Sequence, residues 1–222
     1  MINLQGITKT YRMGKRDLTV LKGVNLNITK GELVAIMGAS GSGKTTMLNL
    51  IGCLDRPTSG EYYFEGKEVS RLGGSELASI RGQKIGFIFQ TFNLLSRLTA
   101  LANVELGMTY ANGVNRQLAI EALEKVGLGD RIKHRPIELS GGEQQRVAIA
   151  RAIAKKPSLF LADEPTGQLD SHSGQEVISI LVSLHKEQGI TSLIVTHDIN
   201  IARNCQRIIH IKDGEIIGEE MV

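Results

Sequence analysis

The sequence has few of the cysteines and none of the long apolar runs that are typical of secreted and membrane proteins. Its 222 residues include only two cysteines, Cys53 and Cys205. Neither lies in a Cys-x-x-Cys or Cys/His spacing, which predicts reduced thiols, with Cys53 in the core and Cys205 part-buried. No apolar run approaches the roughly 18 residues of a membrane span, and residues 1–6 show no secretory signal. By itself this chain is therefore expected to be cytoplasmic.

Aromatic residues and runs of basic residues are also scarce. Aromatic residues make up 4% of the chain, and the formal net charge is only +3 with no concentrated run of lysine or arginine. Nucleic acid is therefore not an expected partner. A content of 41% hydrophobic and 22% charged residues excludes a disordered or collagen-like chain. Glycine is the exception, with 25 residues of 222, about 11% where roughly 7% is usual.

Short apolar runs alternate with longer helical patterns, which predicts an α/β fold with a parallel sheet. Residues 33–37 form a continuous apolar run, as expected of a buried central strand. Helices are predicted through Met47 to Ile51 and through Val177 to Leu184. Further core strands are predicted at residues 84–89, 158–163 and 192–195, followed by a hairpin at 207–217 with its turn at Asp213-Gly214. An antiparallel β layer is predicted from residues 2–7 and 20–28 and a hairpin at 61–69.

The middle of the chain has a different pattern. Apolar residues such as Ala119, Ala122, Leu123 and Val126 recur at helical spacing, and no strand pattern appears before Leu159. We interpret residues 92–154 as a mainly helical inserted subdomain. Residues 1–91 and 155–222 are interpreted as the core of the same single domain.

One glycine cluster predicts a phosphate-binding loop. Residues 38–45 match the pattern G-x-x-x-x-G-K-[ST] between a predicted strand and a predicted helix. The glycines let backbone N–H groups point into one concavity, to which the helix adds its positive end. Lys44 would supply a charge for the β- and γ-phosphates, and the Thr45 hydroxyl could bind Mg²⁺. The alternative is a Gly/Ser turn that only caps a helix.

Polar side chains follow several predicted core strands. Asp163 ends an apolar strand, where it could bind Mg²⁺, and Glu164 could polarise an attacking water. Alternatively, these two residues only begin a polar turn before Pro165. Gln90 could bind the metal or a water but could equally be a surface residue, and His197 could contact a γ-phosphate or simply cap its strand.

A second glycine cluster opens a helix at Ser140-Gly141-Gly142. Ser140 is a good N-cap, and the two glycines expose N–H groups at the positive helix end. The cluster is either a second anion site or only an N-cap beside a close helix contact. Because the chain has one phosphate loop, a second anion site must serve the same nucleotide or one bound elsewhere, such as on a second subunit.

Together these motifs resemble the ATP-binding subunits of ABC transporters. The residues that carry the resemblance are, in order, Gly38 to Thr45, Gln90, Leu139-Ser140-Gly141-Gly142, Leu159 to Glu164 and His197. Residues 51–61 and 98–106 further resemble the MacB/LolD branch of lipoprotein-release and macrolide- or peptide-export ATPases. The resemblance implies a P-loop NTPase (RecA-like) core, ATP hydrolysis and a transport-coupled function.

The resemblance also implies an assembly. Two copies would pair head to tail, with each ATP between the phosphate loop of one copy and Ser140 to Gly142 of the other. A separate transmembrane permease subunit would hold the chain at the cytoplasmic face of the membrane, near Gln90 and the helical insertion. Cargo and direction are not determined by this sequence.

The resemblance assigns roles to individual residues. Glu164 would be the general base, acting with His197, Lys44 and Gln90. Mg²⁺ would be held by Thr45, Gln90 and Asp163. ATP would contact Tyr11, as an adenine-stacking residue whose alternative is simple packing, and Gly38, Ala39, Ser40, Gly41, Ser42, Gly43, Lys44, Thr45, Thr46, Ser140, Gly141, Gly142 and Asp170.

Two positions depart from the family pattern. Glu143 stands where glutamine is frequent, and Gln168 where a small residue often precedes Leu169-Asp170. A non-transport ABC ATPase acting on DNA or the ribosome is a second hypothesis, against which the chain lacks a coiled-coil insertion, a tandem ATPase unit and a basic tail. A regulator of cell division or a mechanical relay across the membrane is a third hypothesis, which the sequence does not separate from export.

Overall fold

A computed structural model describes residues 1–14, 16–111 and 113–222 and divides the chain into two compact units. The first unit contains Met1–Ala78 and Thr191–Val222, and the second contains Ser79–Ile190. The boundary at residues 78 and 79 falls inside helix α2 (Gly74–Lys84). The predicted helical segment 92–154 lies entirely within the second unit.

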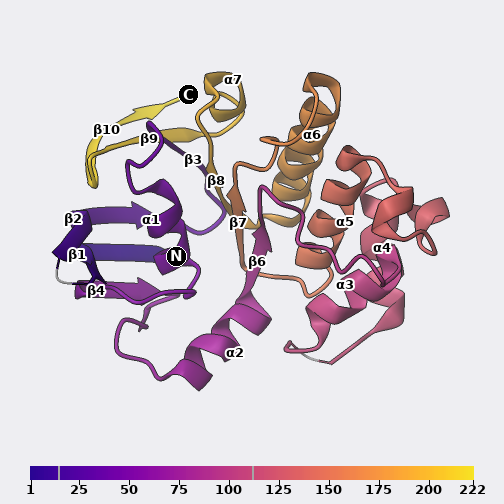
Figure 1. The fold of residues 1–222 in the computed structure, drawn as a ribbon, viewed down its shortest axis with the longest axis horizontal. Coiled ribbons are helices and arrows are strands. Elements are labelled where there is room, and N and C mark those ends of the chain that lie inside the picture. Colours follow the sequence, from indigo (N-terminus) through magenta and orange to yellow (C-terminus); the bar gives the residue numbers. More distant parts are fainter. Residues whose placement is uncertain (15, 112) are drawn as a thin grey trace. The chain divides into compact units, whose positions relative to one another are not determined.

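The first unit contains the predicted antiparallel β layer. Its strand order is β2-β1-β4-β5, and Figure 1 shows β1, β2 and β4 side by side. The strands are β1 (Ile2–Met13), β2 (Arg16–Ile28), β4 (Ser59–Phe64) and β5 (Lys67–Glu68). The first two are longer than predicted: after irregular pairing between Leu4 and Thr10, residues 10–13 continue the ladder in regular register with residues 16–19.

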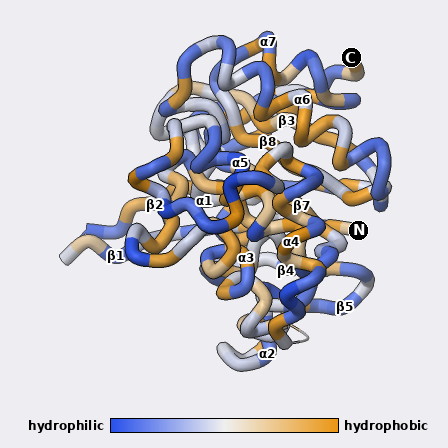
Figure 2. The backbone as a smooth tube through the Cα atoms, turned by 90° about the vertical axis from the view of Figure 1, so that its right-hand side faces the viewer, coloured by the Kyte–Doolittle hydropathy of each residue, from blue (hydrophilic) through white to orange (hydrophobic). Residues whose placement is uncertain are grey.

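The remaining strands of the first unit are three parallel strands and one antiparallel edge strand, β10. They lie in the order β10-β9-β3-β8, in which β3 pairs in parallel with both β8 and β9. All five residues of β3 are apolar, and the β3 and β8 segments are hydrophobic in Figure 2. These elements are β3 (Leu33–Met37), α1 (Lys44–Ile51), β8 (Thr191–Val195), α7 (Ile199–Ala202), β9 (Arg207–Lys212) and β10 (Glu215–Met221).

The second unit combines two parallel strands with a group of helices. Strands β6 (Ile85–Ile88) and β7 (Leu159–Asp163) pair directly, and helices α5 and α6 lie side by side in Figure 1. The helices are α3 (Ala100–Met108), α4 (Arg116–Lys125), α5 (Gly141–Ile153) and α6 (Ser171–Gln188), with short 3₁₀ turns η1 (Gly129–Arg131) and η2 (Pro136–Glu138). The α/β fold with a helical segment after residue 92 is therefore confirmed.

Both cysteines are buried thiols. Cys53 packs in the core as predicted, but the prediction that Cys205 is part-buried is wrong, because it is only 4% exposed. Burial raises the pKa of the Cys205 thiol to about 12. Within the described residues, no helix combines the length and apolar character needed to cross a bilayer.

Candidate functional site

The phosphate loop lies between β3 and α1 in the first unit, as predicted. Two of its glycines, Gly38 and Gly43, are required by packing. Gly43 has a φ of 105°, and a Cβ at this position would lie 2.9 Å from Leu21 Cδ2. A Cβ on Gly38 would collide with the carbonyl oxygen of Ile211. The loop therefore packs closely against β2 and β9.

Lys44 is held across this loop rather than extended into solvent. Its side chain is buried, and Nζ donates hydrogen bonds to the carbonyl oxygens of Gly38 at 2.8 Å and Ala39 at 2.9 Å. Ser42 Oγ is buried without a hydrogen-bond partner among the described residues. The loop thus gathers an ammonium group and an unpaired hydroxyl, both suited to phosphate oxygens.

The C-terminal hairpin supports the loop through Gly214. The Gly214 N–H donates to the Ser42 carbonyl at 3.0 Å, and the Gly214 carbonyl accepts from the Lys22 N–H at 2.9 Å. Gly214 has a φ of 84°, and a Cβ there would overlap the carbonyl oxygen of Val20. Strand β2, the phosphate loop and the β9–β10 turn are therefore joined at one residue.

Gly214→Ala is expected to destabilise the chain by about 3 kcal/mol, since it adds a steric clash to an unfavourable backbone conformation. ATP affinity should fall with it, because the clash displaces the support of Ser42. Thermal unfolding and ATP titration measure the two effects. Gly66→Ala is the matched control: its φ is 81° with open space around the Cβ position, so only the backbone cost of about 1 kcal/mol applies. Equal losses in the two variants would contradict the proposed support.

Tyr11 belongs to a small polar network on β1. Its hydroxyl donates to Asp55 Oδ2 at 2.8 Å, and Lys9 Nζ lies 4.7 Å from its ring centroid. Lys9 Nζ also donates to Asp55 Oδ1 at 2.7 Å. Burial, together with the bond to Asp55, raises the pKa of Tyr11. One ring face therefore carries a cation, and stacking of adenine on the ring stays a prediction. The contribution of Asp55 was not foreseen from the sequence.

His197 follows β8 at the same edge as the phosphate loop. Ile36 of β3 pairs with Val195 of β8, and the Thr196 N–H donates to the Ile36 carbonyl at 3.1 Å. This register places His197 level with Gly38, at the carboxyl ends of neighbouring parallel strands, where ligands of α/β sheets bind. The first unit therefore brings His197 to the same sheet edge as the phosphate loop, which continues into Thr45 and Thr46 at the start of α1.

The second unit brings Gln90 next to the segment after Glu164. Ile88 of β6 pairs with Ala162 of β7, so that Gln90 and Glu164 extend these strands at the same level. Glu164 has a φ of 45°, a region that non-glycine residues rarely adopt. A Cβ on Gly167 would lie 2.7 Å from Gln90 Nε2. Asp163 ends β7 directly before this turn.

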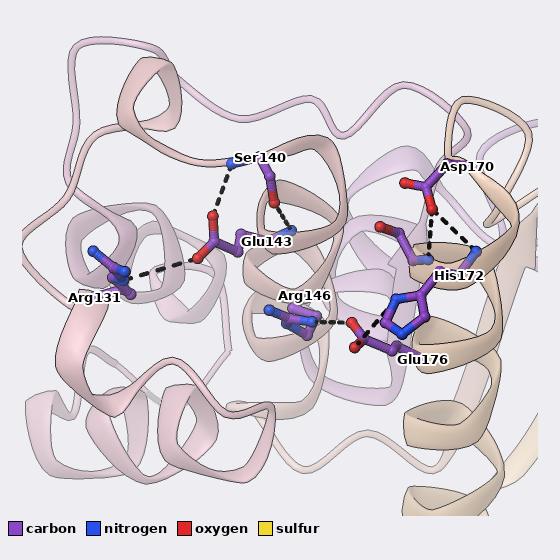
Figure 3. Close-up of polar contacts among 8 residues, drawn as sticks. Arg131, Ser140, Glu143, Arg146, Asp170, His172 and Glu176 are labelled. Atoms are coloured by element: carbon purple, nitrogen blue, oxygen red, sulfur yellow. Dashed lines mark hydrogen bonds and ion pairs between the residues drawn. The ribbon is translucent and has the colours of Figure 1, made fainter.

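The second glycine cluster begins α5, and its N-terminus has a reciprocal cap (Figure 3). Ser140 Oγ accepts the Glu143 N–H at 3.2 Å, and Glu143 Oε2 accepts the Ser140 N–H at 2.8 Å. The bond from the Ser140 N–H lowers the pKa of Glu143. Arg131 Nε lies 3.8 Å from Glu143 Oε1. Glu143, one of the two positions at which this chain departs from the family pattern, therefore places a carboxylate at the positive helix end.

Asp170 is the N-cap of α6, close to the start of α5. Its Oδ1 accepts the N–H groups of His172 and Ser173, each at 3.0 Å (Figure 3). Hydrogen bonds from Ser173 lower the pKa of Asp170. A Cβ on Gly142 would lie 3.0 Å from Ser173 Cβ, so the two helix N-termini are in contact. Within one chain the Asp170 carboxylate caps α6. Its contact across a dimer stays a prediction.

Comparisons with known proteins cover the entire chain. Residues 21–167 match the family described as ABC transporter. The chain is 52% identical to the uncharacterized ABC transporter ATP-binding protein MJ0796 of Methanocaldococcus jannaschii, over 99% of this chain and 97% of that protein. It is 51% identical to the macrolide export ATP-binding/permease protein MacB of Pectobacterium atrosepticum, over 99% of this chain and 34% of that protein. The chain thus spans about a third of that fused relative.

A solved structure shows the same fold. It is described as a dimeric post-hydrolysis state of the ATP-binding cassette MJ0796 bound to ADP and Pi. It superposes with a TM-score of 0.92 at 51% identity, covering 100% of this chain and 98% of that one. The site residues named above therefore lie on a cassette fold whose solved relative carries the products of ATP hydrolysis.

Proposed function

The chain belongs to the ABC transporter ATP-binding proteins, of the MacB/LolD type, and from that membership we infer that it is the ATP-binding and ATP-hydrolysing subunit of a transport complex. The observation that carries this function is the buried Lys44 ammonium, which the carbonyl oxygens of Gly38 and Ala39 hold across the phosphate loop. This arrangement fits the β- and γ-phosphates of a nucleotide.

We propose that residues 38–46 bind the ATP phosphates and that Tyr11 contacts the adenine. The proposed Mg²⁺ ligands are the Thr45 hydroxyl, the Gln90 amide oxygen and the Asp163 carboxylate. Their donors are all oxygen atoms, the type that Mg²⁺ prefers. The metal would supply charge neutralisation at the phosphates. Glu164 would accept the proton of the attacking water, with Gln90 and His197 orienting the water and the γ-phosphate.

We propose that two copies close head to tail on two ATP molecules. Ser140, Gly141 and Gly142 of one copy would face the phosphates bound by the other, and Asp170 would lie at the interface. This arrangement gives the positive end of α5 a ligand, and the solved relatives named for MJ0796 are described as dimers. Residues 92–154 would act as the helical subdomain that presents α5, with 1–91 and 155–222 as the core.

We propose that a separate transmembrane permease subunit holds the dimer at the cytoplasmic face of the membrane. The relatives named MacB join an ATP-binding region and a permease in one protein, which supports a membrane partner for this chain. Export, or extraction of lipoproteins or peptides, is the proposed use of the ATP. Purification of the chain from detergent-treated membranes should recover a multi-span membrane protein, whereas recovery of ribosomes or nucleic acid would contradict the proposal.

Glu143→Gln should strengthen the ATP-bound dimer. The carboxylate offsets the positive end of α5 and repels the phosphates of the partner's ATP, whereas an amide oxygen can still accept the Ser140 N–H. In a Glu164→Gln background, the ATP concentration at half-maximal dimerisation should fall about fivefold, as measured by light scattering. Glu138→Gln is the matched control, because Glu138 Oε2 accepts the Arg135 N–H at 2.6 Å in the same local geometry. An unchanged midpoint for Glu143→Gln would refute the electrostatic effect.

A further inference from the structure

Gln145 is a buried polar residue to which none of the motifs assigns a role. It lies on α5, five residues after the Ser140 N-cap, and its side chain is 0% exposed. Its Oε1 has no hydrogen-bond partner among the described residues. Because an unpaired buried acceptor is costly, a glutamine at this position needs a reason other than packing.

The amide nitrogen of Gln145 supplies that reason. Nε2 donates to the carbonyl oxygen of Pro165 at 2.6 Å and to that of Phe89 at 3.3 Å. Pro165 directly follows Glu164, and Phe89 directly precedes Gln90. One side-chain amide therefore joins the backbone beside the proposed general base to the backbone beside a proposed metal and water ligand. Both acceptors require the NH₂ group, which fixes the orientation of the amide.

The same helix also holds the other side of Gln90. Arg151 Nη1 donates to the Asn93 carbonyl at 2.6 Å, and Nη2 donates to the Phe92 carbonyl at 3.0 Å. Helix α5 thus binds the segment on both flanks of Gln90, with Gln145 before it and Arg151 after it. Because α5 is one continuous helix of 13 residues, a displacement of its N-terminus is transmitted to both contacts.

We propose that Gln145 is a positioning residue for ATP hydrolysis, which sets the distance between Gln90 and Glu164 and couples it to the start of α5. The inference rests on the proposed ATPase function. Contact of Ser140 to Gly142 with a nucleotide would reach the hydrolytic residues through this amide. Without the Gln145 amide, the carbonyls of Phe89 and Pro165 would lose the link between them, and the neighbouring Gln90 and Glu164 could shift apart. Misplacement of a catalytic group by about 1 Å costs about 100-fold in rate.

Gln145→Met tests the proposal, because it keeps side-chain length and removes both donors. The expected result is a fall of about 10- to 100-fold in the single-turnover rate of ATP cleavage, with ATP affinity and thermal unfolding close to those of the control. The matched control is Gln144→Met. Gln144 is the neighbouring residue on α5, and its Nε2 donates to the carbonyl of Leu139, which precedes the N-cap of the same helix, at 3.1 Å.

A double-variant cycle separates positioning from a general structural role. If Gln145 acts through Gln90, adding Gln145→Met to Gln90→Ala should slow cleavage by less than the product of the two separate effects. Fully multiplicative effects, or native cleavage by Gln145→Met, would overturn the proposal. Gln145→Asn, which moves the amide back by one methylene, gives the same test if the methionine variant does not fold. Failure of the unaltered chain to cleave ATP would instead overturn the proposed function.

Discussion

Glu164→Gln should lower ATP turnover by about 1,000-fold, because a glutamine of the same size cannot accept the proton of the attacking water. ATP binding should persist, since the phosphate loop and Lys44 are unaltered. With hydrolysis blocked, the head-to-tail dimer should accumulate in saturating ATP. Phosphate release measures the first effect, and light scattering measures the second.

Glu187→Gln, at an exposed position of α6, is the control for loss of a carboxylate. It should hydrolyse ATP at the native rate. Native turnover by Glu164→Gln would refute the general-base assignment. A Glu164→Gln chain that stays monomeric in saturating ATP would refute the assembly while leaving the catalytic role open to the turnover measurement.

Lys44→Ala should weaken ATP binding as well as abolish hydrolysis. The ammonium is already directed across the loop by the Gly38 and Ala39 carbonyls, so little side-chain entropy is lost when phosphate oxygens bind. Losing this charge-assisted contact should weaken ATP affinity about 100-fold and make both turnover and ATP-dependent dimerisation undetectable. Titration with a fluorescent ATP analogue measures the affinity.

Lys22→Ala is a suitable comparison for Lys44→Ala, because Lys22 is an exposed lysine on β2 whose contact near the loop is made by its backbone N–H. It should bind ATP normally. Circular dichroism should show that both variants remain folded. Unaltered ATP affinity in Lys44→Ala would exclude the proposed phosphate contact.

The fold was predictable where a local pattern fixes the structure. The continuous apolar run of β3 and the glycine spacing of the loop after it are such patterns, and the predicted strand and the position of the loop between strand and helix are confirmed. Helix α2 was missed because it has glycines at Gly74 and Gly82 and only Leu77 is buried, so it lacks an apolar stripe. The outer half of β1 was missed because it contains no fully buried apolar residue and follows irregular pairing between Leu4 and Thr10.

The site was predictable only as far as its motifs extend. Motifs identified Lys44 and Glu164 as candidates, since neighbouring residues in the chain define those positions. They did not locate Asp55, which reaches Tyr11 from 44 positions away, or Gln145, whose acceptors lie 56 and 20 positions away. Such contacts join segments that lie far apart in the chain, so no local spacing of residue types predicts them.

Dependence of the phosphate loop on Gly214 has a practical consequence for truncated or fused versions of this chain. A version ending at Lys212 would keep every residue of the G-x-x-x-x-G-K-T pattern and would still be identified as a nucleotide-binding sequence. It would lack the N–H group that holds the Ser42 carbonyl. Fusions to a permease should therefore be joined beyond β10, because the nucleotide-binding unit includes the hairpin that closes the chain.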